Sequence, residues 1–133
     1  MRRSELKTAC LSLLDERADI HPSGHQAKLA ARYSLPTSKG RKIGLMFEKS
    51  DHVPAHLWVP RIFALTLFGM HFSFREYPVA AGISTSYSDR RTRQGRHSAL
   101  MPMADMAKSD LVRFTIASPA ELATILSVLV ETN

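Results

Sequence analysis

The stretch 111–133, LVRFTIASPAELATILSVLVETN, decides the fold class. Residues 111–116 alternate between the two faces of the chain, as a half-buried strand does. Ser118 and Glu121 form a capping box, and Pro119 occupies the first helical position. The residues that follow predict a helix packed on a sheet, because they form an apolar stripe at helical spacing: Leu122, Ile125, Leu126 and Leu129.

The middle of the chain predicts the strands of that sheet. Short apolar runs occur at 43–47 and 57–59, and the longest β-type stretch extends from 61 to 77. Gly69 lies where the side-chain parity of this stretch switches, which suits a bulge or a tight hairpin turn. Aromatic side chains concentrate in this stretch, so we expect the core to lie there.

Two helices are predicted before the strands. The first helix is expected over residues 4–18, with Ser4 as its N-cap and an apolar stripe that includes Cys10. Residues 25–33 are rich in good helix formers. This second helix and the turn after it resemble the first half of a DNA-binding helix-turn-helix, although Gly40 is unfavourable within a recognition helix.

Together these elements predict a single α+β domain over residues 1–133. We expect a mostly antiparallel sheet of about four or five strands, with N-terminal helices and a C-terminal helix packed on it. The chain divides into four parts. They are a helical N-terminal part (1–40), central strands (41–77), a long basic loop region (78–108), and a strand with the C-terminal helix (109–133).

The charge balance favours a polyanionic partner, since 18 Lys and Arg residues oppose 12 Asp and Glu residues. No run approaches the roughly 18 apolar residues of a membrane span, so no membrane partner is expected. The single cysteine, Cys10, lies on the apolar side of its helix and is expected to be a buried, inert thiol. The basic start leads into acidic residues rather than a signal sequence, which favours a soluble cytoplasmic protein.

The segment 86–100, SYSDRRTRQGRHSAL, is the leading candidate for a binding site. It falls in an expected surface connection over 81–102, with a short edge strand at 83–87, and loops of this length are often functional. Arginine forks match phosphate oxygens, and a second basic cluster at 39–42 would extend the track if both lie on one face. The predicted nucleic-acid-binding residues are Lys39, Arg41, Lys42, Tyr87, Arg90, Arg91, Arg93, Arg96 and His97.

No metal or other cofactor is predicted. His21 and His25 have the spacing of metal ligands on a helix, as do His52 and His56, but a proline interrupts both pairs. The acidic residues are scattered, and there is no glycine-rich phosphate loop. We therefore assign no catalytic residue.

We expect a non-catalytic protein that binds DNA or RNA through contacts to the backbone. One alternative is a protein-protein interaction module or inhibitor that binds an acidic partner, with Met101, Met103 and Met106 as an adaptable apolar patch. Another is a small nuclease-like hydrolase, for which Glu48 and Glu76 at strand ends are well placed. The sequence is also compatible with a homodimer.

Overall fold

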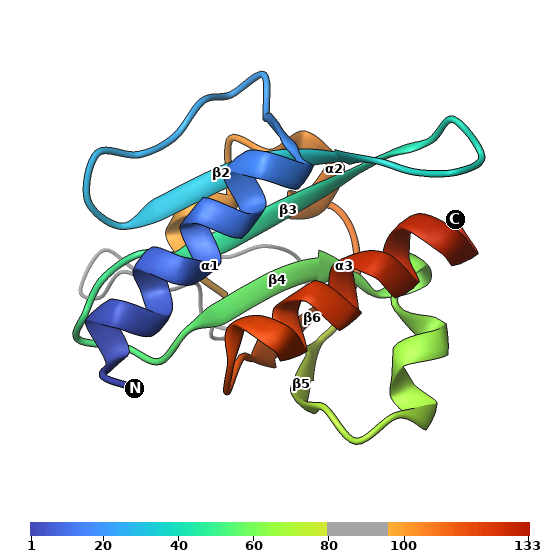
Figure 1. Ribbon diagram of the computed structural model, residues 1–133. Helices are drawn as coiled ribbons and strands as arrows, with labels where there is room; N and C mark the ends of the chain where they lie inside the picture. Colours follow the sequence, from blue (N-terminus) through green and yellow to red (C-terminus); the bar gives the residue numbers. More distant parts are fainter. Residues whose placement is uncertain (80–95) are drawn as a thin grey trace.

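One antiparallel sheet of six strands organises the described part of the protein, in the order β1-β2-β3-β4-β6-β5 (Figure 1). The computed structural model describes residues 1–79 and 96–133. Within them, the sheet and two long helices form the predicted α+β domain. The strands are β1 (Asp19–Ile20), β2 (Ala30–Pro36), β3 (Lys42–Glu48), β4 (His56–Pro60), β5 (Ser73–Tyr77) and β6 (Leu111–Thr115).

Two helices, α1 (Arg3–Arg17) and α3 (Pro119–Thr132), cover one face of the sheet (Figure 1). The predicted cap of α3 is confirmed, because the Ser118 hydroxyl accepts a hydrogen bond from the Glu121 N–H at 3.2 Å. None of the described helices has the length and apolar character needed to cross a membrane. The main core lies between these helices and the sheet, and it includes Cys10, Leu14, Tyr33, Leu45, Phe47, Leu57, Phe114, Leu122, Ile125, Leu126 and Leu129.

Residues 96–110 cover the opposite face of the sheet and are called the covering segment below. This segment has little regular structure. It contains only the 3-10 turn η3 (Ser98–Leu100) and the short helix α2 (Ala104–Ala107). The side chains of Met103 and Met106, which belong to this segment, are fully buried against the sheet in the same core cluster as Trp58. The predicted adaptable methionine patch is therefore wrong at these two positions, since their side chains fill a second core.

The predicted helix over 25–33 is wrong, because residues 30–36 form strand β2 instead. Ala31, Tyr33 and Leu35 alternate into the main core while the strand pairs with β3 along its whole length. Pairing in the sheet therefore outweighs the helix propensity of the alanines. The resemblance to a helix-turn-helix ends with this correction.

The predicted long strand over 61–77 is also wrong in its first half. Two 3-10 turns, η1 (Arg61–Phe63) and η2 (Leu65–Gly69), precede β5. Ala64 and Leu67 are buried whereas Leu65 is half exposed. The spacing of three between buried residues is that of a 3-10 turn and not of a strand, whose buried residues are two apart.

Lys7 fastens α1 to the connection between β3 and β4. Its ammonium group donates hydrogen bonds to the carbonyl oxygens of Glu48, at 2.7 Å, and Ser50. The side chain is buried, and burial lowers the pKa of Lys7 to about 8. The folded protein therefore releases this proton at a lower pH than the unfolded chain does.

We expect Lys7 to make folding stability rise with pH between about 8 and 10.5. In this window the unfolded chain binds the Lys7 proton and the folded protein does not, whereas below it both states are protonated. The free energy of unfolding of the wild type, relative to the Lys7→Met variant, should therefore increase across the window by up to about 3 kcal/mol. Urea unfolding at a series of pH values measures this difference.

Comparison with the variant is needed because burial raises the pKa of Cys10 to about 11, which has the opposite effect on stability. Cys10 is present in both proteins, so the part of its contribution that comes from burial, its largest cause, cancels in the difference. A difference that stays constant from neutral to alkaline pH would contradict the effect expected of Lys7.

Candidate functional site

Four predicted binding residues lie outside the described residues: Tyr87, Arg90, Arg91 and Arg93. The predicted edge strand at 83–87 lies outside them too. Val79 and Arg96, the described residues on either side of 80–95, are held near each other. The Val79 N–H donates to the Asp110 carboxylate at 2.8 Å, and Arg96 donates to the carbonyl oxygen of the adjacent Ser109. Val79 and Arg96 thus both lie beside the start of β6.

Arg96 is buried, with 2% of its surface exposed, and not at the surface as predicted. Its guanidinium donates to the carbonyl oxygens of Tyr77 at 2.7 Å, Ala107 at 3.1 Å and Ser109 at 2.6 Å. Burial lowers the pKa of Arg96, and the nearby Asp110 opposes this shift. This position counts against the predicted phosphate contact, since Arg96 joins the covering segment to β5.

We expect Arg96→Lys to destabilise the fold by about 2–4 kcal/mol, because an ammonium group lacks the planar fork and would leave buried carbonyl groups without donors. Urea unfolding followed by the emission of Trp58, the only tryptophan, measures the loss. Arg2, whose side chain is exposed and pairs with Glu5, provides the control. Arg2→Lys should change stability by less than about 0.5 kcal/mol, and an equal effect of both substitutions would contradict this role.

The other predicted residues that the structure describes lie in two places, beside Arg96 and at the β2–β3 hairpin. His97 is half-buried at the start of η3, where its Nδ1 accepts from the Ala99 N–H at 3.0 Å. Lys39, Arg41 and Lys42 are exposed at the β2–β3 hairpin. Gly40 has φ +79°, a turn conformation that favours glycine, which explains why a glycine interrupts the basic cluster. A face shared with the arginines at 90–93 remains a prediction.

A buried polar cluster on the covered face was not predicted from the sequence. Oε2 of Glu48 accepts hydrogen bonds from Trp58 Nε1 at 2.8 Å and His56 Nδ1 at 3.1 Å. Burial raises the pKa of Glu48, but these hydrogen bonds outweigh burial and hold the pKa below its ordinary value. Glu48 is therefore an interior carboxylate and not the open strand end considered for a hydrolase.

Two further arginines, which sequence analysis did not select, face each other across β5 and β6. Arg75 and Arg113 are cross-strand partners, and their guanidinium carbons lie 5.1 and 5.2 Å from the centre of the Tyr77 ring. Arg113 also lies over Trp58, at 5.8 Å. Its Nε atom is buried and has no hydrogen-bond partner in the described part of the chain. Like charges directly opposite in a sheet repel each other, so an anion would stabilise this pair.

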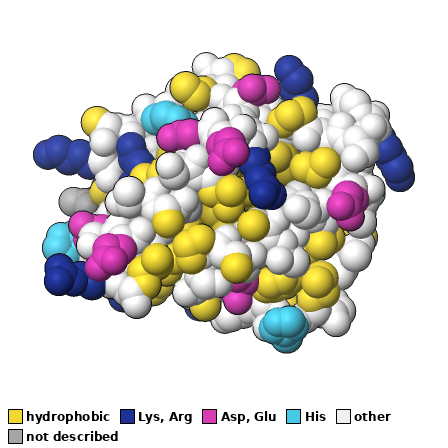
Figure 2. Space-filling model, viewed as in Figure 1, with side chains coloured by type: hydrophobic (Ala, Val, Ile, Leu, Met, Phe, Trp, Pro, Cys, Tyr) yellow, Lys and Arg dark blue, Asp and Glu magenta, His cyan; other side chains and the backbone are white. Residues whose placement is uncertain are grey.

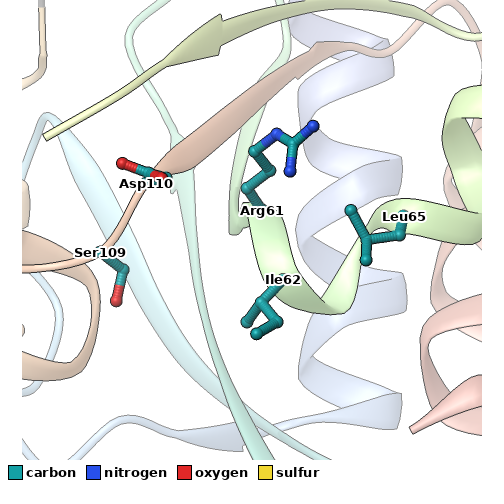
Figure 3. A pocket seen from close by; sticks show the side chains of 5 residues that line it. All are labelled: Arg61, Ile62, Leu65, Ser109 and Asp110. Atoms are coloured by element: carbon teal, nitrogen blue, oxygen red, sulfur yellow. The ribbon is translucent and has the colours of Figure 1, made fainter.

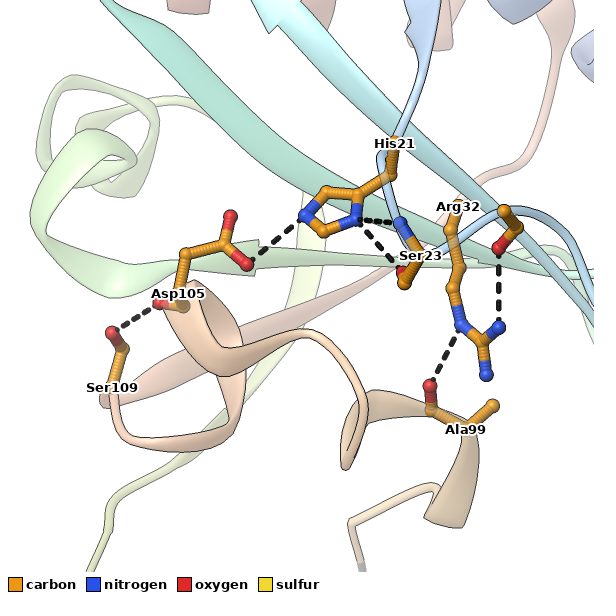
Figure 4. Close-up of polar contacts among 7 residues, drawn as sticks. His21, Ser23, Arg32, Ala99, Asp105 and Ser109 are labelled. Carbon is orange, nitrogen blue, oxygen red and sulfur yellow. Dashed lines mark hydrogen bonds and ion pairs between the residues drawn. The ribbon is translucent and has the colours of Figure 1, made fainter.

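Polar contacts also join the covering segment to β2 and to the turn before it (Figure 4). Arg32 donates to the carbonyl oxygens of Ala99 at 3.0 Å and Gly24 at 3.1 Å. Close by, His21 Nε2 lies 3.1 Å from Asp105 Oδ1, and His21 Nδ1 lies 2.8 Å from the Ser23 hydroxyl oxygen. These contacts join Ser23, His21 and Asp105 in one series of hydrogen bonds, in that order.

A shallow cavity of about 360 Å³ lies between the 3-10 turns and the start of β6 (Figure 3). Ile62 and Leu65 form its apolar side and are 71% and 50% exposed. Ser109 and Asp110 form its polar side. Arg61, which also lines it, forms an ion pair with Glu76 and so does not present an unpaired charge there.

The described residues contain no group of three or more His, Cys, Asp or Glu side chains that could hold a metal ion. In the two histidine pairs, His21 is paired with Asp105, His56 with Glu48, and His25 Nδ1 accepts from the backbone N–H of Arg32. These contacts are alternatives to metal ligation.

We expect chelation by EDTA to leave the thermal unfolding midpoint unchanged, because the side chains of His21, His25 and His56 already have protein partners. Differential scanning fluorimetry with and without the chelator measures the midpoint. A decrease of several degrees would instead indicate a bound metal ion that stabilises the folded state.

Comparison of the chain with protein-family models, curated proteins and solved structures finds no significant match. The function is therefore inferred from the chemistry of the residues themselves. Among the described residues, the cross-strand arginines and the serine–histidine–aspartate chain are the two arrangements whose chemistry points to a ligand or a reaction.

Proposed function

We propose that the protein binds nucleic acid, DNA or RNA, without cleaving it, through contacts to the phosphate backbone. The site comprises the cross-strand pair Arg75 and Arg113 together with the arginine-rich segment that begins after β5. The observation that carries the proposal is this pair of guanidinium groups beside the rings of Tyr77 and Trp58. Guanidinium groups bind phosphate oxygens, and here the buried rings of Tyr77 and Trp58 hold two of them together.

The surface charge supports the proposal, because most of the basic residues are not neutralised by the protein's own acids. Apart from Arg96, the lysines and arginines of the described residues form only two ion pairs, Arg2 with Glu5 and Arg61 with Glu76. Arg75 is exposed, as are the lysines and the arginine of the β2–β3 hairpin. These exposed cations are therefore available to an external polyanion.

The distribution of charge argues against the helix-covered face as the site. In Figure 2, lysine and arginine side chains on that face are scattered among acidic ones and do not gather into a patch. On the opposite side of the sheet, Arg75 and Arg113 lie together on the face of Trp58. Arg96 binds the carbonyl oxygen of Tyr77, so the chain re-enters the described structure beside these two arginines.

The main test is the salt dependence of affinity, because each neutralised phosphate releases counterions. The experiment measures the affinity for a fluorescein-labelled 20-mer at several salt concentrations. For each phosphate contact, the logarithm of the association constant should fall by about 0.9 per tenfold increase in salt for duplex DNA, and by about 0.7 for a single strand. With three or four arginines engaged, tenfold or more should be lost between about 50 and 200 mM salt. The double variant Arg91→Ala/Arg93→Ala should lose the part of the slope that corresponds to about two phosphate contacts. Arg75→Ala should lose the part that corresponds to about one. Fluorescence anisotropy measures both.

The control removes two positive charges from the helix-covered face, with Arg2→Ala and Arg3→Ala in one variant. This variant should retain nearly the parent's slope, which separates a local site from net charge. Failure of the parent to bind at low salt, or equal binding by the Arg91/Arg93 variant, would reject the proposal. An acidic protein partner would then be the function to test.

A further inference from the structure

We propose that Ser23 is a nucleophile activated by His21 and positioned by Asp105, and that the protein cleaves unhindered esters through an acyl-Ser23 intermediate. This activity is separate from nucleic-acid binding, since none of the three residues belongs to the binding site proposed above. It would be a second function, located at the turn before β2.

The hydrogen bonds give His21 the polarity of a general base (Figure 4). The Asp105 carboxylate, which has no proton to donate when ionised, lies 3.1 Å from His21 Nε2, so Nε2 carries the ring proton. Nδ1 therefore presents its lone pair to the Ser23 hydroxyl, 2.8 Å away. A hydroxyl on one ring nitrogen and a carboxylate on the other is the arrangement by which serine hydrolases activate their nucleophile.

The carboxylate that orients the ring is fixed by the fold. Asp105 lies in the first turn of α2, and its carboxylate lies against Gly44 of β3, where a Cβ atom would overlap Asp105 Oδ2. Only glycine at position 44 leaves room for this contact. Asp105 is 84 positions from His21 in the chain, so the pair depends on the covering segment being held on the sheet.

The nucleophile lies on a constrained and accessible turn. Gly24 follows Ser23 with φ +74°, and its N–H donates to the carbonyl oxygen of His21 at 2.8 Å. The backbone N–H of Ser23 also donates to Nδ1, at 3.1 Å, which holds the ring beside the turn. Ser23 itself is exposed. A sharp turn that presents its serine to solvent allows an ester carbonyl to approach.

The reaction balances without a further reagent. The Ser23 oxygen attacks the ester carbonyl carbon while its proton passes to His21 Nδ1. The same proton then leaves with the alcohol, and acyl-Ser23 remains. Water, deprotonated by His21, attacks the acyl carbon and releases the carboxylic acid and the original serine. The exposed turn leaves the Ser23 hydroxyl open to unhindered ester carbonyls.

The test uses a fluorophosphonate probe, which reacts with activated serines, and p-nitrophenyl acetate as the ester. Mass spectrometry of the labelled chain should find one adduct, on Ser23. Ser23→Ala should eliminate this adduct and slow p-nitrophenolate release at least tenfold. Because this substitution removes only an exposed hydroxyl, its result decides the nucleophile without concern for folding.

Two variants test the supporting residues, with the emission of Trp58 as a check that the covering segment stays in place. His21→Gln and Asp105→Asn should each slow the labelling of Ser23 at least tenfold with Trp58 emission unchanged. Ser98→Ala, at the serine next to His97, provides the control and should label like the parent. An adduct on another residue would overturn Ser23 as the nucleophile. Unchanged labelling in His21→Gln with native emission would show that His21 only orients the turn and does not activate Ser23.

Discussion

The hydrogen bonds of the Arg96 guanidinium are the constraint on which the covered face of the sheet depends. A segment with little regular structure cannot satisfy its own backbone carbonyls, and buried carbonyls without donors are costly. Arg96 supplies donors to Tyr77, Ala107 and Ser109, and so joins the end of β5 to the turn after α2. Arg32 does the same for Ala99, at the other end of the segment.

The two faces of the sheet are buried by different means, and this explains where the polar residues lie. Helices satisfy their own backbone, so the face beneath α1 and α3 can be almost wholly apolar. The irregular segment needs side-chain donors and acceptors. Of the five buried Lys, Arg, Glu and His side chains among the described residues, four are on its side: Arg32, Glu48, His56 and Arg96. Both proposed sites adjoin this layer because reactive groups are concentrated there.

The sequence predicted the elements whose local signals agree with their packing, and failed where tertiary contacts decide. The capping box and apolar stripe were sufficient for α3, and short apolar runs were sufficient for β3 and β4. Residues 25–33 are rich in helix formers, yet residues 30–36 become a strand, because β3 pairs with all of them. At the candidate sites, the arginine run predicted basic character but not that Arg96 is interior. The pairing of His21 with Asp105 has no sequence signal, because it joins residues 84 positions apart.

The energy of the Arg75–Arg113 pair indicates why this edge of the sheet suits an anion. Repulsion between like charges directly opposite in a sheet costs up to about 1 kcal/mol. A guanidinium over an aromatic ring gains about 0.5–1 kcal/mol at exposed sites, and this pair has three such contacts, with Tyr77 and Trp58. The rings therefore offset the repulsion and hold both arginines together in the absence of a ligand, but they leave the charge unneutralised. A phosphate placed there would meet two preassembled cations, and little of its binding energy would be lost in ordering them.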